Sequence, residues 1–137
     1  MLTRNQEQEK IMLSIYQYLF YQRMNQEDLV RILEDVFELP YDEISLFAKE
    51  VAVKTLLNQK DIDDEISNHL IKWTLNRINI IAHAILLMAI GEYRYTKECN
   101  KAEIINIAIE FAKKYLDDND YKFINAILDK ILWLKTI

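Results

Sequence analysis

Apolar residues recur along this chain at spacings of three and four positions, which places them on one face of a helix. In residues 121–131, YKFINAILDKI, the positions that follow this spacing are Ile124, Ile127, Leu128 and Ile131. The same pattern along the rest of the chain predicts about seven helices, with Trp73 on the buried face of the fourth and the seventh running to about Lys135. The polar residues expected to cap four of them are Asn25, Asp42, Asp61 and Asn100.

The helix expected near residues 78–97 is apolar almost all round, so we expect it at the centre of the fold. Its most apolar stretch, IIAHAILLMAI at residues 80–90, is too short to span a bilayer. The polar amino terminus also lacks the apolar run of a secretion signal. The sequence therefore predicts a cytoplasmic protein with no membrane partner.

Composition favours an all-α fold. The 137 residues include one glycine and one proline, whereas sheets and α/β nucleotide-binding folds need many turn glycines. Hydrophobic residues make up 51% of the chain and charged residues 28%, which is typical of a globular protein. With no linker or repeat, residues 1–137 are expected to form a single domain.

The usual catalytic and metal-binding patterns do not occur. The acidic cluster at residues 117–120 lacks the glycine and glutamate of a calcium loop, so helix capping explains it better. His69 and His83 lie fourteen positions apart, outside the two-histidine helical metal pattern. The single cysteine, Cys99, has no nearby histidine that would mark it as a nucleophile. We therefore expect no enzyme, no metal and no cofactor.

The net charge of −5 does not indicate nucleic-acid binding, but basic residues cluster at two expected turns. They are Arg94, Lys97 and Lys101 at one turn and Lys113, Lys114 and Lys122 at the next. Cations are common at helix ends, so solvated ends explain them as well as a binding site does. Lys122 and Phe123 form a basic–aromatic pair that could hold a phosphate and a base.

Several motifs in the second half of the chain occur together. Glu92 ends the apolar helix, and NIAIEFAK follows at residues 106–113. KFINAILDK occupies residues 122–130, and an Asn-x-x-x-Ile-Asp helix at residues 58–63 leads to Trp73 and Arg77. These motifs resemble, in order, those of the NusB family of bacterial transcription antitermination factors. The likeness covers residues 57–131 well, and the first 56 residues match mainly in length and helical pattern.

The resemblance implies an all-α fold of two packed helical subdomains. It also implies binding of the boxA element of ribosomal RNA together with NusE, a small-subunit ribosomal protein, in an antitermination complex with RNA polymerase. The RNA-binding residues expected on this basis are Arg4, Lys10, Lys101, Lys122 and Phe123. Phe123 would stack on an unpaired base, unless it is simply a core residue. Asn106 and Asn125 are expected to join helices through buried hydrogen bonds.

The chain also departs from the family pattern. Arg4 and Lys10 are the only basic residues among the first 22, where family members usually carry an arginine-rich segment. Leu87 stands where the family often has arginine, and Leu116 and Ala126 replace frequent glycines. Fewer phosphate contacts imply weaker binding with a smaller salt dependence. The alternative function is a NusB-like protein-interaction module that has lost RNA binding, and the sequence also leaves a homodimer open.

Overall fold

The computed structural model describes residues 1–70 and 75–133, apart from the side chains of Asn76 and Trp133. Within these ranges the chain forms seven α-helices and no strand, which confirms the predicted all-α fold. The helices are α1 (Arg4–Gln22), α2 (Leu29–Phe37), α3 (Leu46–Leu57), α4 (Gln59–Ser67), α5 (Ile80–Tyr95), α6 (Lys101–Tyr115) and α7 (Asp118–Leu128). Three short turns, η1 (Tyr41–Glu43), η2 (Leu75–Arg77) and η3 (Asp129–Trp133), complete the described elements.

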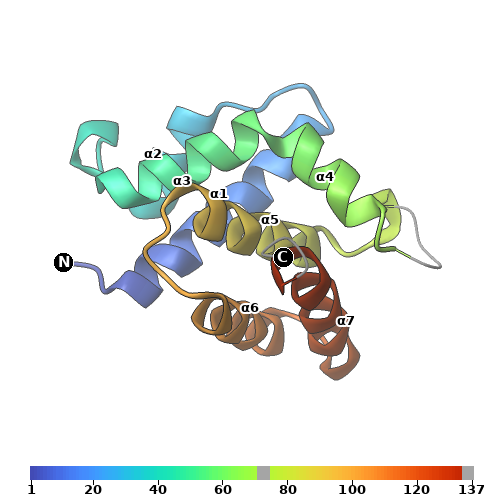
Figure 1. The fold of residues 1–137 in the computed structure, drawn as a ribbon. Coiled ribbons are helices and arrows are strands. Elements are labelled where there is room, and N and C mark those ends of the chain that lie inside the picture. The colour runs from blue at the N-terminus through green and yellow to red at the C-terminus, as the bar shows by residue number, and fades with distance from the viewer. Residues whose placement is uncertain (71–74, 134–137) are drawn as a thin grey trace.

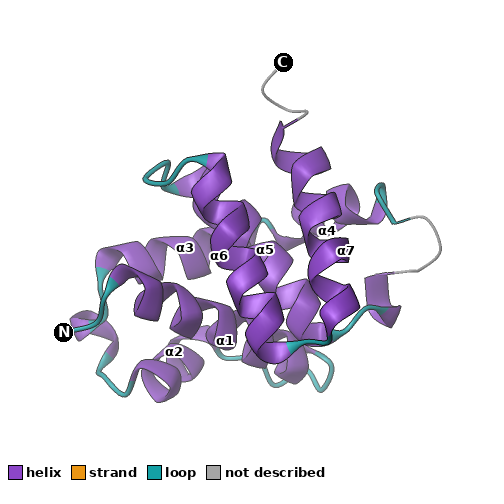
Figure 2. Cartoon of the chain, turned by 90° about the horizontal axis from the view of Figure 1, so that it is seen from below, coloured by secondary structure: helices purple, strands orange, loops and turns teal. Residues whose placement is uncertain are grey.

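Helix α5 lies at the centre of the molecule, as its apolar sequence predicts (Figure 1). It packs against α1, α3, α4, α6 and α7, and ten of its 16 residues are buried. The helices α1–α4 form one layer around it. Helices α6 and α7 form the other as an antiparallel pair, side by side in Figure 2. This arrangement confirms the two packed helical subdomains.

One of the four predicted helix caps is correct. The side chain of Asn100 accepts a hydrogen bond from the Glu103 backbone and donates one to the Glu103 carboxylate. Asn25 is wrong as a cap because it adopts a left-handed turn, with φ of 55°, before α2. The residues that cap α2 and α3 instead are Asp28 and Ser45, and Asp61 lies inside the first turn of α4.

The seventh helix was expected to reach Lys135. Regular α-helix ends at Leu128 and continues as a π turn through Trp133. Residues 134–137 and Trp73, which was expected on a buried face, lie outside the described residues. Within the part of the chain described, no helix combines the length and apolar character of a membrane span.

Helices α3 and α5 approach each other closely at Gly91, the only glycine in the sequence. A Cβ atom on Gly91 would lie 1.7 Å from Thr55 Oγ1 and 2.9 Å from Thr55 Cβ, so no larger residue fits there without movement. The Thr55 hydroxyl is buried and has no hydrogen-bond partner among the residues that the structure describes. Gly91 is therefore required by packing between helices and not by a turn.

Helices α1 and α5 are joined by a buried polar pair. The Gln8 amide donates to both carboxylate oxygens of Glu92, each at 2.9 Å, and both side chains are almost fully buried. Burial raises the pKa of Glu92, while the hydrogen bond from Gln8 acts in the opposite direction. Glu92, in the last turn of the apolar helix α5, thus has a structural partner on the first helix.

Candidate nucleic-acid interface

The five residues expected to bind RNA do not gather in one place. Arg4 and Lys101 lie near the α5–α6 connection, whereas Lys122 and Phe123 lie in the second turn of α7. Helix α6, which is about 21 Å long, begins at the first group, and α7 turns back beside it, so the two groups lie near opposite ends of the α6–α7 pair. Lys10 lies at a third position, between α1 and α2. Any single contact surface is therefore built from only some of them.

Arg4 is held by neighbouring elements, although it is partly exposed. Its guanidinium pairs with Glu98 in the α5–α6 connection and lies 3.5 Å from the centroid of the Phe47 ring in α3. Glu7, one turn further along α1, is a second acidic neighbour at 3.8 Å. Arg4 thus joins the start of α1 to α3 and to the loop before α6.

Lys10 and Lys101 are also engaged within the protein. The Lys10 ammonium donates to the Val36 carbonyl at 3.1 Å, at the end of α2. Lys101 is 9% exposed, and its ammonium lies 5.7 Å from the centroid of the Tyr93 ring. A cation over an aromatic face in a partly dry site is stabilised there. Both lysines therefore contribute to packing in this structure.

Lys122 and Phe123 have different surroundings. Lys122 is exposed, and no ion pair or hydrogen bond joins its ammonium to the described part of the chain. Phe123 is half-buried at the edge of the core and lines a pocket of about 280 Å³. The residues that line this pocket, the α7 pocket, are Arg77, Ile78, Asn79, Ala82, Asp120 and Phe123.

Arg77 is a residue that the sequence reasoning did not select as a contact. It ends η2, is exposed, and has no ionic partner in residues 1–70 or 75–133. The fold brings it to the same pocket as Phe123, 46 positions later in the chain. The one sequence signal for Arg77 was its position after Trp73 in a family motif. That motif did not indicate that Arg77 would lie near α7.

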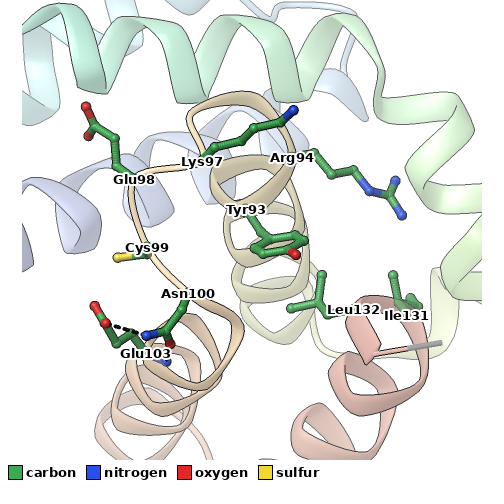
Figure 3. A pocket seen from close by; sticks show the side chains of 9 residues that line it. All are labelled: Tyr93, Arg94, Lys97, Glu98, Cys99, Asn100, Glu103, Ile131 and Leu132. Carbon is green, nitrogen blue, oxygen red and sulfur yellow. Dashed lines mark hydrogen bonds between the residues drawn. The ribbon is translucent and has the colours of Figure 1, made fainter. Parts of the chain in front are cut away.

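A larger pocket, of about 850 Å³, lies between the end of α5, the α5–α6 connection and η3 (Figure 3). It is lined by Tyr93, Arg94, Lys97, Glu98, Cys99, Asn100, Glu103, Ile131 and Leu132. Arg94 is paired with Glu65 of α4, and Glu98 with Arg4. Because its charges are of both signs and largely paired, this pocket is a poorer match to a phosphate backbone.

The remaining polar groups have structural partners. Burial and the neighbouring carboxylates of Glu92 and Glu103 raise the pKa of Cys99 to about 12, so its thiol stays protonated at neutral pH. The His83 Nε2 atom lies 2.6 Å from the carboxylate of Asp63 in α4. Within the described ranges, no group of three or more potential metal ligands occurs.

Comparison with known proteins identifies the family. The NusB family model matches residues 5–132. The transcription antitermination protein NusB of Oceanobacillus iheyensis is 32% identical over 131 residues, covering 96% of this chain and 99% of the relative. The chain belongs to the NusB family. The solved T. maritima NusB structure superposes with a TM-score of 0.81 at 30% identity, covering 95% of this chain and 90% of the other.

A second solved structure shows a NusB protein in an assembly. It contains the antitermination factors NusB and NusE in complex with double-stranded RNA. The superposition has a TM-score of 0.77 at 20% identity and covers 95% of this chain and 97% of that one. At this identity the likeness bears on the fold of the NusB family member, not on its ligands.

The structure also shows what the family departures do. Leu87 is fully buried in α5, where an apolar side chain fits. Leu116 caps α6 at φ of −129°, a conformation that needs no glycine, and Ala126 is exposed on α7. The two glycine replacements therefore introduce no backbone strain into this member of the NusB family.

Two predicted helix ties in the NusB motifs are wrong. Asn106 is exposed on α6, so its amide can hydrogen-bond with water. Asn125 is half-buried, and no hydrogen bond joins its side chain to the residues described here. The amide that does join two helices is Gln8, in the part of the chain where the family motif is weakest.

Proposed function

We propose that this protein acts in transcription antitermination by binding boxA-like RNA together with NusE, and that the α7 pocket contacts the RNA. The action is one of binding within an RNA polymerase complex, without catalysis, by a single domain in the bacterial cytoplasm. Membership of the NusB family and the antitermination role of the curated relatives support the general function.

One observation supports the location. Phe123 offers an aromatic ring beside a pocket, and the cations of Arg77 and Lys122 lie on the elements that flank it without an acidic partner in the described chain. Single-stranded RNA is held by stacking of bases on aromatic rings and by cations on its phosphates. Arg77 and Lys122 are the available cations, because Arg4, Lys10 and Lys101 are engaged with other helices.

Asp120 contributes a negative group to the same pocket. A carboxylate repels phosphate, but it accepts hydrogen bonds from the exocyclic amino groups of bases. We assign the Asp120 carboxylate to a hydrogen bond with the edge of a base. The cations of Lys122 and Arg77 are assigned to the phosphates. Asp120→Ala should then weaken binding to an RNA with an amino-bearing base at this position, whereas simple repulsion predicts tighter binding to every RNA.

The test measures binding of a boxA-like RNA, with and without NusE, across a salt series. Phe123→Leu should weaken binding by about 1–3 kcal/mol while folding stability changes little. Lys122→Gln and Arg77→Gln should each reduce the salt slope by about one unit and affect all RNA sequences alike. The matched controls are Phe20→Leu, an exposed aromatic on α1, and Lys130→Gln, an exposed lysine beyond α7.

Two outcomes would overturn parts of this proposal. If the control variants lose as much affinity as the α7 variants, the α7 pocket is not the contact surface. If the wild-type chain binds no RNA at low salt even with NusE, the protein is a NusB-fold interaction module that no longer reads RNA.

A further inference from the structure

The acidic charge of this protein is concentrated in one short segment. Residues 27–43 contain seven carboxylates and one arginine, a formal charge of −6, whereas the whole chain carries −5. The other 120 residues hold 15 acidic and 16 basic side chains, so their formal charge is +1. This segment comprises α2 and the turns on either side of it.

These seven carboxylates are not neutralised by the protein. All the ion pairs in the described ranges lie outside residues 27–43. Asp28 and Glu34 accept hydrogen bonds from backbone amides, which satisfies these groups but leaves their charge in place. The negative field of the segment is therefore directed outward.

Exposed apolar side chains occupy the same region. Val30 is 47% exposed on α2, Leu39 just after α2 is 38% exposed, and Tyr21 near the end of α1 is 37% exposed. A pocket of about 430 Å³ separates Tyr21 from Asp35, across the α1–α2 boundary. Helix α2 packs mainly against α1, so its outer side is uncovered. Figure 1 shows α2 at the upper left of the molecule and α7 at the lower right.

We propose that this surface, the α2 face (Tyr21, Asp28, Val30, Asp35, Glu38 and Leu39), docks a lysine- or arginine-rich amphipathic segment of a protein partner. The apolar groups favour burial under a protein chain, and the carboxylates select the positive charge of that chain. RNA is excluded, because its phosphates would meet seven carboxylates. Arg31 is the one cation of the segment and lines the pocket, where it limits how deeply a basic group enters.

The first experiment locates the contact. The probe is a synthetic helix-forming peptide of leucine and lysine at helical spacing, added to the full ¹⁵N-labelled chain. The amide shifts of residues 21–39 should move, and a peptide with glutamate in place of lysine should leave them unchanged. Shifts that centre elsewhere, or that appear when the chain is concentrated without peptide, overturn the proposal; the second result would mean that the face joins two copies.

The second experiment separates charge from apolar contact. Asp35→Asn with Glu38→Gln, and Val30→Ser with Leu39→Ser, should each weaken peptide binding about fivefold. The control variants are Asp117→Asn with Asp118→Asn, and Leu46→Ser with Leu57→Ser, which remove exposed groups of the same chemical kind elsewhere on the chain. Equal losses in variants and controls would show only non-specific attraction and overturn the proposal.

This inference does not depend on the proposed RNA site. The α2-face variants should bind RNA as tightly as the wild type, and the Phe123 variants should bind the peptide normally. A loss of RNA binding in the α2-face variants, with folding intact by circular dichroism, would contradict the assignment of this face to a protein partner.

Discussion

Polar side chains have opposite surroundings at the α1–α5 junction and at the start of α7. At the junction, Gln8 and Glu92 are buried and satisfy each other, and Thr55 and Gly91 bring α3 and α5 together beside them. Near the start of α7, Lys122 has no hydrogen-bond or ionic partner in the described chain, and neither has Asn125, three positions further along the helix. The first arrangement fixes the packing of the helices, whereas the second leaves groups available for a ligand.

The comparison shows that residue type alone does not reveal a role. Two lysines lie near the starts of neighbouring helices, Lys101 in the first turn of α6 and Lys122 in the second turn of α7. Lys101 is buried over Tyr93, and Lys122 is exposed. The same difference separates the amides of Gln8 and Asn125. Changes at the junction should therefore alter stability, and changes at the start of α7 should alter binding.

The largest effect is expected for Gly91→Ala. The new Cβ would overlap Thr55, so unfolding free energy should fall by about 3 kcal/mol, even though alanine is the better helix former. Urea denaturation measures this loss. Thr55→Ala should recover only part of it, because the Thr55 Cβ atom itself lies 2.9 Å from the added carbon. A stability close to that of the wild type would show that α3 and α5 can move apart at little cost in free energy.

The next effect contrasts the two amides. Gln8→Ala should cost about 2 kcal/mol, because it leaves the Glu92 carboxylate buried without its donor. Asn125→Ala should change stability by less than about 0.5 kcal/mol, since no hydrogen bond is lost. The two variants are compared in the same denaturation experiment. Similar losses of stability in both variants would mean that Asn125 does join two helices, and the contrast between the two amides would then be wrong.

The sequence predicted the helices and the central position of α5 because apolar spacing reports burial directly. It could not predict which polar residue meets which, since these contacts join helices far apart in the chain. Gln8 and Glu92 are 84 positions apart, and Arg77 reaches the Phe123 pocket only through the packing of η2 near α7. Motif resemblance selected Lys122 and Phe123, but it also selected Lys101, which is buried with its ammonium near the Tyr93 ring.

A smaller effect, with the opposite sign, is expected for Glu92→Gln. Burial raises the pKa of Glu92, so folding penalises the charged carboxylate relative to the unfolded chain, where water solvates it. Replacement by the neutral amide should stabilise the fold at pH 7 by about 1 kcal/mol. The gain should shrink as the pH falls towards 4.5, because the wild-type carboxyl then takes up a proton. Thermal unfolding at several pH values measures it, and destabilisation at pH 7 would contradict it.

The smallest effect is expected at Glu9, which follows the buried Gln8 on α1 and lies on the surface. Its carboxylate accepts hydrogen bonds from Lys114, at 2.6 Å, and from the Tyr115 hydroxyl. These bonds lower the pKa of Glu9 below 4.5, so the ionised form is favoured in the folded state. The stability that it contributes is present above the unfolded pKa and is lost as the pH falls through the lower folded pKa.

Glu9→Gln should therefore lower the melting temperature by about 1–2 °C at pH 7, and the difference from the wild type should vanish in acid. Salt should reduce this difference, because the Lys114 pair is exposed, but it should leave the Glu92→Gln gain almost unchanged, because that carboxylate is buried. Two adjacent residues of α1 are thus linked to carboxyl groups with opposite pH dependence. Gln8 donates to the buried carboxylate of Glu92, whereas Glu9 carries its own carboxylate at the surface. If both variants respond to pH and salt in the same direction, burial does not distinguish the junction from the surface.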